Sequence, residues 1–267
     1  LDETALMSVL RRRSKASIAV ISLVSILPNS FLTSSNCFFS PSTPFSIPVA
    51  THFPHATGIG LAMNYLGEKN AVLTFTGDGG TSEGDFYEAL NWAGVFKAPV
   101  VFVVRNNQWA ISVPRDKQTA AQTLAQKAVA AGVRGIQVDG NDPLGVYLVV
   151  KEALERARKG EGPALVEALT YRLGLHTTAD DPTRYRSKEE VERARKKEPF
   201  IRYTQFLKRK GILTDRKMDR IWREAQELVD SEAEEAERFK TKPENMFKHV
   251  YGRMPPELEE QMREMGV

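Results

Sequence analysis

The sequence contains a single cysteine, Cys37, among its 267 residues. One cysteine cannot form a disulfide within the chain, and it cannot supply the set of thiolates that a cysteine-based zinc site needs. The sequence also lacks a concentrated block of basic residues, because its net charge is only +3 and its acidic and basic residues are interleaved. We therefore expect no nucleic-acid binding. The low cysteine content suits the reducing cytoplasm, where we expect the protein to reside.

A long apolar run is missing as well. The apolar stretch at residues 16–27 is interrupted by serines and has 12 residues, whereas a membrane-spanning helix needs about 20. Basic residues precede this stretch, as in a signal peptide, but no clear small-residue cleavage site follows it. We interpret residues 1–45 as an atypical amino-terminal segment that is disordered or misread, and we expect no association with a membrane.

Residues 46–186 show the alternating pattern of an α/β domain. Short apolar runs predict strands, and segments with apolar residues at helical spacing lie between them. Because the strands are apolar throughout, we expect a parallel, doubly wound sheet with helices on both faces and ligands at the carboxyl ends of its strands. The predicted strands are 71–76, 99–104, 135–138 and 164–171, and the predicted helices are 85–96, 118–131 and 143–159.

Residues 187–267 have a different character. Charged segments with apolar residues at helical spacing predict helices at 188–197, 199–210 and 214–241. We expect these residues to form a helical carboxyl-terminal extension that covers the sheet or a partner protein.

Polar residues follow two of the predicted strands. Residues 77–80 (GDGG) follow the first strand, and residues 105–107 (RNN) follow the second. Glycines let backbone N–H groups approach an anion closely, and the amino terminus of the next helix favours negative charge. Asp78 and Asn107 offer the hard oxygen ligands that magnesium prefers, and Arg105 is suited to gripping a phosphate. The pattern therefore indicates a magnesium-diphosphate site.

These short patterns also have simpler explanations. An Asp-Gly pair after a strand is often only a turn, and Asn-Asn pairs commonly end strands. A dinucleotide-binding G-x-G-x-x-G motif is not matched, because the glycines between residues 77 and 84 have the wrong spacing. A phosphate-binding Gly-Lys-Ser/Thr motif is absent from the sequence. From the residues alone, a structural turn and a phosphate site both remain open.

Two longer segments carry a family resemblance. In the first, Gly-Asp-Gly at 77–79 is followed after the 26 residues 80–105 by Asn-Asn at 106–107, which resembles the thiamine diphosphate motif. The segments RNNQWAIS (105–112) and YRLGLHTTADDPTRYRSKEE (171–190) resemble the α subunit of the branched-chain 2-oxo acid dehydrogenase, with pyruvate dehydrogenase a near relative. The resemblance extends from about Ser46 to the carboxyl end. It implies the thiamine-diphosphate-binding fold.

The resemblance implies a set of metal and cofactor ligands. It implies that Asp78, Asn107 and the backbone carbonyl of Trp109 bind magnesium. It implies that the diphosphate is held by Gly77, Gly79, Gly80 and Arg105. Asp78 stands where branched-chain members have glutamate, and either carboxylate would serve as a magnesium ligand.

The amino-terminal end of the matching region implies two further contacts. Backbone atoms around Ile47 and Val49 match the segment that lies against the aminopyrimidine of the cofactor. A potassium site of some members is matched by Ser46, Pro48 and Thr51. His52 stands where that site has a glutamine, which weakens the expectation of a potassium ion here.

His176 matches a histidine that lies on a mobile loop near the reactive carbon of the cofactor. An imidazole can donate a proton or a hydrogen bond near neutral pH, so we expect His176 to be catalytic and to contact the cofactor. An exposed surface histidine is the alternative. Thr177 stands where eukaryotic relatives have a phosphorylated serine, and a phosphate there would add negative charge beside His176.

The resemblance implies oxidative decarboxylation of a 2-oxo acid with transfer of the acyl group to a lipoyl arm. The expected partners are a β subunit in an α2β2 heterotetramer, the lipoyl transacylase core of the complex and a small 2-oxo acid. A branched-chain 2-oxo acid is preferred, and a pyruvate dehydrogenase α subunit is the alternative. Residues 1–45 do not resemble the corresponding region of relatives, which includes a Tyr-Arg pair for the diphosphate. A non-catalytic subunit that binds β is therefore one alternative. A nicotinamide-dependent oxidoreductase built on a doubly wound sheet is another.

Overall fold

The computed structural model describes residues 48–248 and 250–267. Ser46, Ile47 and the atypical segment 1–45 lie outside the described residues. The chain divides into two compact units between Gln205 and Phe206. The domain boundaries that we expect from the sequence stay a prediction.

The first unit is built on a parallel four-stranded sheet. Its strand order is β1-β2-β6-β5, and every neighbouring pair is parallel. The predicted α/β class with a parallel sheet is therefore confirmed. The strands are β1 (Val72–Gly77), β2 (Val100–Asn106), β5 (Arg134–Asp139) and β6 (Ala164–Leu169).

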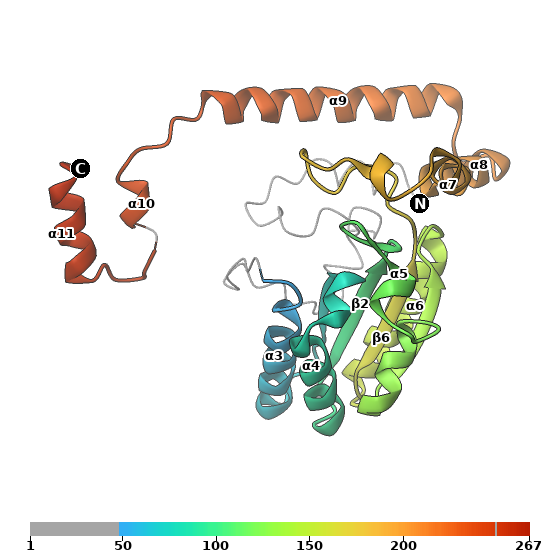
Figure 1. The fold of residues 1–267 in the computed structure, drawn as a ribbon, viewed down its shortest axis with the longest axis horizontal. Coiled ribbons are helices and arrows are strands. Elements are labelled where there is room, and N and C mark those ends of the chain that lie inside the picture. The colour runs from blue at the N-terminus through green and yellow to red at the C-terminus, as the bar shows by residue number, and fades with distance from the viewer. Residues whose placement is uncertain (1–47, 249) are drawn as a thin grey trace. The chain divides into compact units, whose positions relative to one another are not determined.

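Helical segments cover both faces of this sheet (Figure 1). The helices α3 (His52–Leu66) and α4 (Gly84–Val95) and the 3-10 segment η3 (Ala125–Ala131) pack on one face, and α6 (Pro143–Arg158) packs on the other. The predicted helix 143–159 is confirmed at its start, where the Asp142 side chain accepts a hydrogen bond from the backbone N–H of Leu144 at 3.1 Å.

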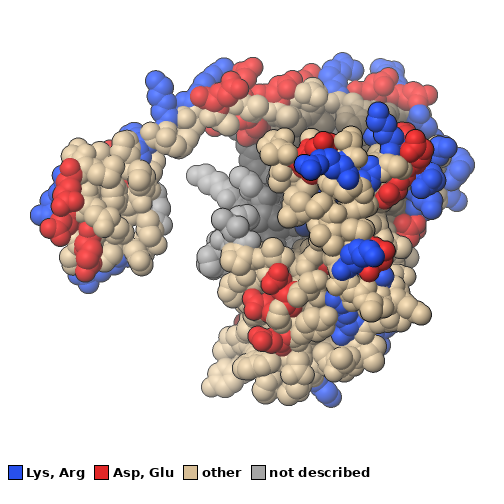
Figure 2. All heavy atoms as spheres, viewed as in Figure 1, with Lys and Arg blue, Asp and Glu red and all other residues tan. Residues whose placement is uncertain are grey.

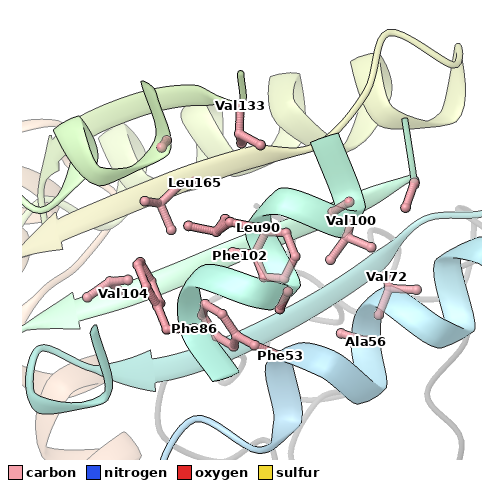
Figure 3. Close-up of a cluster of buried hydrophobic side chains, with 14 of the residues drawn as sticks. Phe53, Ala56, Val72, Phe86, Leu90, Val100, Phe102, Val104, Val133 and Leu165 are labelled. Atoms are coloured by element: carbon pink, nitrogen blue, oxygen red, sulfur yellow. The ribbon is translucent and has the colours of Figure 1, made fainter. Parts of the chain in front are cut away.

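The larger core cluster lies under α3 and α4. The rings of Phe53 and Phe102 lie 4.8 Å apart between centroids, and those of Phe53 and Phe86 lie 5.6 Å apart (Figure 3). Side chains on a strand alternate between its two faces. Accordingly Phe102 of β2 joins this cluster, whereas its neighbours Val101 and Val103 join the cluster under α6.

Helix α3 was not predicted from the sequence. Gly60 lies in its interior, where glycine disfavours a helix by about 1 kcal/mol relative to alanine. A Cβ added at Gly60 would lie 2.7 Å from Cγ2 of Val100, so glycine is needed for the close approach of α3 to β2. Tertiary packing therefore stabilises this helix despite its composition.

The predicted helix 118–131 is wrong in its first half. Thr119 is extended, with φ −159° and ψ 145°, and helical turns are found only at α5 (Arg115–Gln118) and η3. The carbonyl oxygens of Ala121 and Gln122 accept hydrogen bonds from the Arg115 guanidinium, so they are bound by a side chain instead of a helix ladder. The alanine-rich composition did not reveal these contacts.

The first unit ends with charged helices. The hydroxyl of Tyr171 donates to Glu190 at 2.7 Å, which attaches α7 (Lys188–Arg195) to the end of β6. Arg202 pairs with Asp139 at 2.8 Å, which attaches α8 (Pro199–Arg209) to the end of β5. Both contacts are made by residues at or just after the carboxyl ends of strands, so α7 and the part of α8 that belongs to the first unit lie near that edge of the sheet.

The second unit is helical. Its longest helix is α9 (Asp215–Arg238), which is capped by the Thr214 hydroxyl and has no buried residue. Acidic and basic side chains are interspersed along α9 on the face that Figure 2 shows. The shorter helices are α10 (Asn245–Lys248) and α11 (Pro256–Glu264). None of the helices among the described residues has the length and apolar character needed to span a bilayer.

Candidate active site

Two neighbouring strands bring the predicted ligands to one edge of the sheet. Gly77 at the end of β1 is in register with Arg105 of β2, so Asp78 lies one residue and Asn107 two residues after this pair. A 3-10 turn, η2 (Gly79–Ser82), follows Asp78, and a two-residue ladder between β3 (Trp109–Ala110) and β4 (Val113–Pro114) follows Asn107. A Cβ added at Gly79 would lie 2.9 Å from Cβ of Ala110, so the two segments touch.

Asp78 is a buried carboxylate. Its exposed fraction is 1%, and its Oδ2 accepts a hydrogen bond from Nε2 of Gln118 at 2.7 Å. Among the residues that the structure describes, it forms no ion pair with lysine or arginine. A buried carboxylate without a cation is costly, and a bound divalent ion would remove that cost. The Oε1 of Gln118 is also buried and has no hydrogen-bond partner in the described structure, so a second oxygen beside Asp78 is left for a water or an ion.

The other two predicted metal ligands are oxygens with capacity for one more contact. Oδ1 of Asn107 accepts from the backbone N–H of Trp109 at 3.1 Å, and the carbonyl oxygen of Trp109 accepts from Arg172 at 3.2 Å. An amide or backbone carbonyl oxygen has two lone pairs, so each keeps one. One carboxylate and neutral oxygens form a ligand set that fits magnesium bound to a diphosphate.

The three glycines at positions 77, 79 and 80 differ in what a side chain at each position would contact. A Cβ added at Gly80 would lie 2.1 Å from Oγ1 of Thr76, whereas a Cβ added at Gly77 would meet nothing within 4 Å. Gly79 and Gly80 are therefore required by packing inside the protein. Gly77 alone of the three faces open space, as a residue beside a bound ligand would.

This contrast predicts unequal effects of alanine. Gly80→Ala is expected to lower the free energy of unfolding by about 1–3 kcal/mol, because the new methyl group overpacks the Thr76 side chain. Gly77→Ala should change it by less than about 1 kcal/mol. Chemical denaturation of both variants measures the difference. A Gly80→Ala protein that regains stability when Thr76→Ala is added would identify Thr76 as the source of the clash.

Arg105 and Val49 are the other described residues outside the glycine turn and the His176 loop that we predict to contact the cofactor. By strand alternation, Arg105 projects toward the α6 face together with Val101 and Val103, whereas Asn106 projects toward α4 and η3. Burial lowers the pKa of the Arg105 guanidinium below its ordinary value. Val49 is 56% exposed ahead of α3, which Thr51 precedes.

Arg172 joins the His176 loop to the predicted metal ligands. Its guanidinium donates to the carbonyl oxygens of Trp109 at 3.2 Å and Ile111 at 2.5 Å, and to the hydroxyl of Tyr185 at 2.9 Å. The same guanidinium lies 3.4 Å from Nδ1 of His176. A guanidinium only donates, so Nδ1 is the acceptor in this contact and Nε2 is the ring nitrogen that can donate.

Sequence comparison with known proteins identifies the family of this chain. A model of the dehydrogenase E1 component family matches residues 38–245, which is well over half of the chain. The chain belongs to the dehydrogenase E1 component family. Members of this family depend on thiamine diphosphate.

The relatives of this E1 component chain include α subunits of two different dehydrogenases. It is 46% identical over 217 residues to the pyruvate dehydrogenase E1 component subunit alpha of Bacillus subtilis, covering 80% of this chain and 58% of the relative. It is 47% identical over 224 residues to the 3-methyl-2-oxobutanoate dehydrogenase subunit alpha of Mycobacterium tuberculosis, covering 83% and 61%. The chain thus spans about three fifths of the length of these relatives.

Two residues of this E1 component chain, Gln118 and Arg172, were missed by the sequence reasoning, whereas the polar loop that contains Asp180 was expected to form internal contacts. Gln118 contacts Asp78 across 40 positions, and Arg172 contacts Trp109 across 63 positions. Asp180 accepts hydrogen bonds at one oxygen from the backbone N–H of His176 at 2.8 Å and from the hydroxyl of Tyr185 at 2.6 Å. The sequence carries no local signal for the first two contacts, because they depend on the folded sheet.

Asp180 makes the loop of the E1 component chain sensitive to acid. The hydrogen bond from Tyr185, followed by that from the His176 backbone, lowers the pKa of Asp180. A carboxylate with a depressed pKa stabilises the folded loop above its ordinary pKa, and this contribution is lost as the pH falls through the depressed value.

Asp180→Ala is therefore expected to loosen the loop at neutral pH, as acid would in the unmodified protein. Amide hydrogen exchange of residues 174–186 should become faster, with His176 the most affected amide. Asp116→Ala, at an exposed aspartate outside this loop, is the matched control. Equal exchange in both variants would contradict the role of Asp180.

Proposed function

We propose that this chain is the cofactor-binding α subunit of a thiamine-diphosphate-dependent 2-oxo acid dehydrogenase. In this proposal it acts with a β subunit as an α2β2 enzyme, and it passes the acyl group to a lipoyl arm on the transacylase core of the complex. The observation that carries the proposal is the buried carboxylate of Asp78, which lacks a cation among the described residues and lies beside the hairpin that bears Trp109.

In this function the residues of the chain have separate tasks. Asp78, Asn107 and the Trp109 carbonyl would hold magnesium, and Gly77, Gly79, Gly80 and Arg105 would hold the diphosphate. When bound, thiamine diphosphate supplies a carbon nucleophile and a cationic ring that accepts the electron pair left by departing carbon dioxide. His176, held through Arg172 and Asp180, would present its Nε2–H as a donor to the reacting groups.

The chain is about equally similar to relatives that are named for two different substrates. The names of the relatives give pyruvate in one case and 3-methyl-2-oxobutanoate in the other, at 46% and 47% identity. The loop sequence DDPTRYR at 180–186 favours a branched-chain 2-oxo acid, which we propose as the preferred substrate, with pyruvate as the alternative. The potassium ion, phosphorylation of Thr177 and the cytoplasmic location stay predictions.

The proposal is tested by expressing the chain with the β subunit encoded in the same genome. Thiamine diphosphate is titrated with and without magnesium by calorimetry, and decarboxylation of 3-methyl-2-oxobutanoate is compared with that of pyruvate. We expect magnesium-dependent binding and a higher kcat/KM for the branched substrate. A higher value for pyruvate would support the alternative substrate. Stable association with β but no cofactor uptake would instead identify a non-catalytic interaction subunit.

A further inference from the structure

Lys127 is a buried lysine beside the turn that follows Asp78. Its exposed fraction is 8%, and it belongs to η3, 46 positions after the residue it contacts. Its Nζ donates to the carbonyl oxygen of Thr81 at 2.7 Å and to the Thr81 hydroxyl at 3.0 Å. Thr81 is part of η2, so the ammonium group is attached to the turn between Asp78 and α4.

The surroundings of this ammonium compensate its charge only in part. With the carboxylates of the described residues Lys127 forms no ion pair. Its Nζ lies 5.8 Å from the ring centroid of Phe86 and 5.4 Å from that of Tyr87. Cation–π contacts offset part of the cost of burying a charge, but these two rings lie in the first turn of α4, where the helix dipole disfavours a cation. An anion bound at the turn would compensate the charge.

Thr81 connects Lys127 to Asp78. Thr81 is fully buried, and both its hydroxyl and its backbone N–H donate to the carbonyl oxygen of Asp78, at 2.8 and 3.0 Å. Because the Lys127 ammonium donates to the Thr81 hydroxyl oxygen, the hydroxyl proton is directed to Asp78. The backbone of Asp78 is thus fixed from one side, while Gln118 fixes its carboxylate from the other.

We propose that Lys127 is a positioning residue, which acts through Thr81 to hold the turn at Asp78 in the conformation that binds magnesium-diphosphate. This inference rests on the proposed function of the site. Partners that orient a metal ligand without touching the metal typically change metal affinity by about 10–100-fold. We expect a change of this size when the ammonium is removed.

The test uses Lys127→Met, which removes the ammonium and keeps an unbranched side chain, in the chain assembled with its β subunit. The magnesium concentration for half-maximal thiamine diphosphate binding is measured by calorimetry, and the midpoint of thermal unfolding (Tm) is measured without magnesium. We expect the half-saturating magnesium concentration to rise at least tenfold. Lys69→Met, at an exposed lysine, removes the same charge and should leave it unchanged.

Substitutions at Thr81 test whether Lys127 acts on Asp78 through the Thr81 hydroxyl. They are informative even if Lys127→Met does not fold. Thr81→Val removes the hydroxyl and should weaken magnesium-dependent binding, whereas Thr81→Ser keeps the hydroxyl and should restore it. The effects of Lys127→Met and Thr81→Val should be less than additive when combined, because they break one path.

Three outcomes would go against these proposals, each in a different way. A lowered Tm with an unchanged magnesium titration in Lys127→Met and in Thr81→Val would overturn the positioning role and leave only a structural one. Equal weakening of magnesium-dependent binding by Thr81→Val and Thr81→Ser would show that Lys127 does not act through the Thr81 hydroxyl. Absence of magnesium-dependent binding in the unmodified protein would overturn the proposed function itself.

Discussion

Asp78→Asn is expected to lower the affinity for thiamine diphosphate in the presence of magnesium by at least about 100-fold. Even partners outside the ligand shell change metal affinity by about 10–100-fold, and Asp78 is the only one of the three predicted magnesium ligands with a full charge. The amide keeps the shape of the side chain, and its oxygen can still accept from Gln118. The loss would therefore come from the missing charge and not from a cavity.

The same substitution should leave the metal-free protein as stable as before, or make it more stable. Asp78 is 1% exposed and has no cationic partner among the described residues, so asparagine removes a buried charge that is otherwise compensated only when metal binds. Its side chain makes no capping hydrogen bond to η2 that the change would break. Saturating ligand at about 100 times its dissociation constant should stabilise the unmodified protein by about 2.7 kcal/mol and the variant by almost nothing.

Thermal unfolding with and without magnesium and thiamine diphosphate, together with calorimetric titration, separates the two effects. Asp116→Asn is the matched control, because Asp116 is exposed and undergoes the same chemical change. Normal cofactor affinity in Asp78→Asn would contradict the metal site. A large drop in the metal-free Tm would show instead that Asp78 has a structural role.

The edge of the sheet that carries the site could be predicted because its signals are local. Short apolar runs at 71–76 and 99–104 predict strands, and parallel strands bring their carboxyl ends together. The structure confirms both strands and their pairing. The roles of the individual ligands stay predictions: those of Asp78, Asn107 and Arg105 follow from residue type and position, and that of the Trp109 carbonyl follows from the family resemblance.

Features that depend on close tertiary contact could not be predicted. Helix α3 contains Gly60, which only its contact with Val100 explains. Residues 119–124 have a helical composition, yet the Arg115 guanidinium binds the carbonyl oxygens of Ala121 and Gln122. Gln118 has no recognisable motif around it, and its relation to Asp78 exists only once β1 and the segment after β4 are folded together.

His176→Ala is expected to reduce acyl transfer to the lipoyl arm by about 10²–10⁴-fold, the usual contribution of a positioned acid or base. Cofactor binding should change by no more than a few-fold, because His176 is exposed and none of the predicted magnesium ligands is on its loop. Transfer is measured by acylation of a free lipoyl domain in single-turnover conditions, and binding by calorimetry. His55→Ala, at an exposed histidine of α3, is the control for loss of an imidazole.

The variant His176→Gln distinguishes two roles of His176, hydrogen-bond donation and proton transfer. Since Nδ1 of His176 lies against the Arg172 guanidinium at 3.4 Å, Nε2 is the ring atom left to donate. The amide nitrogen of glutamine can occupy a similar position and donate a hydrogen bond, but it cannot release a proton. If His176→Gln retains most of the activity that His176→Ala loses, the residue acts by donation. If both variants lose activity equally, it acts as an acid, and unchanged transfer in both would remove His176 from the mechanism.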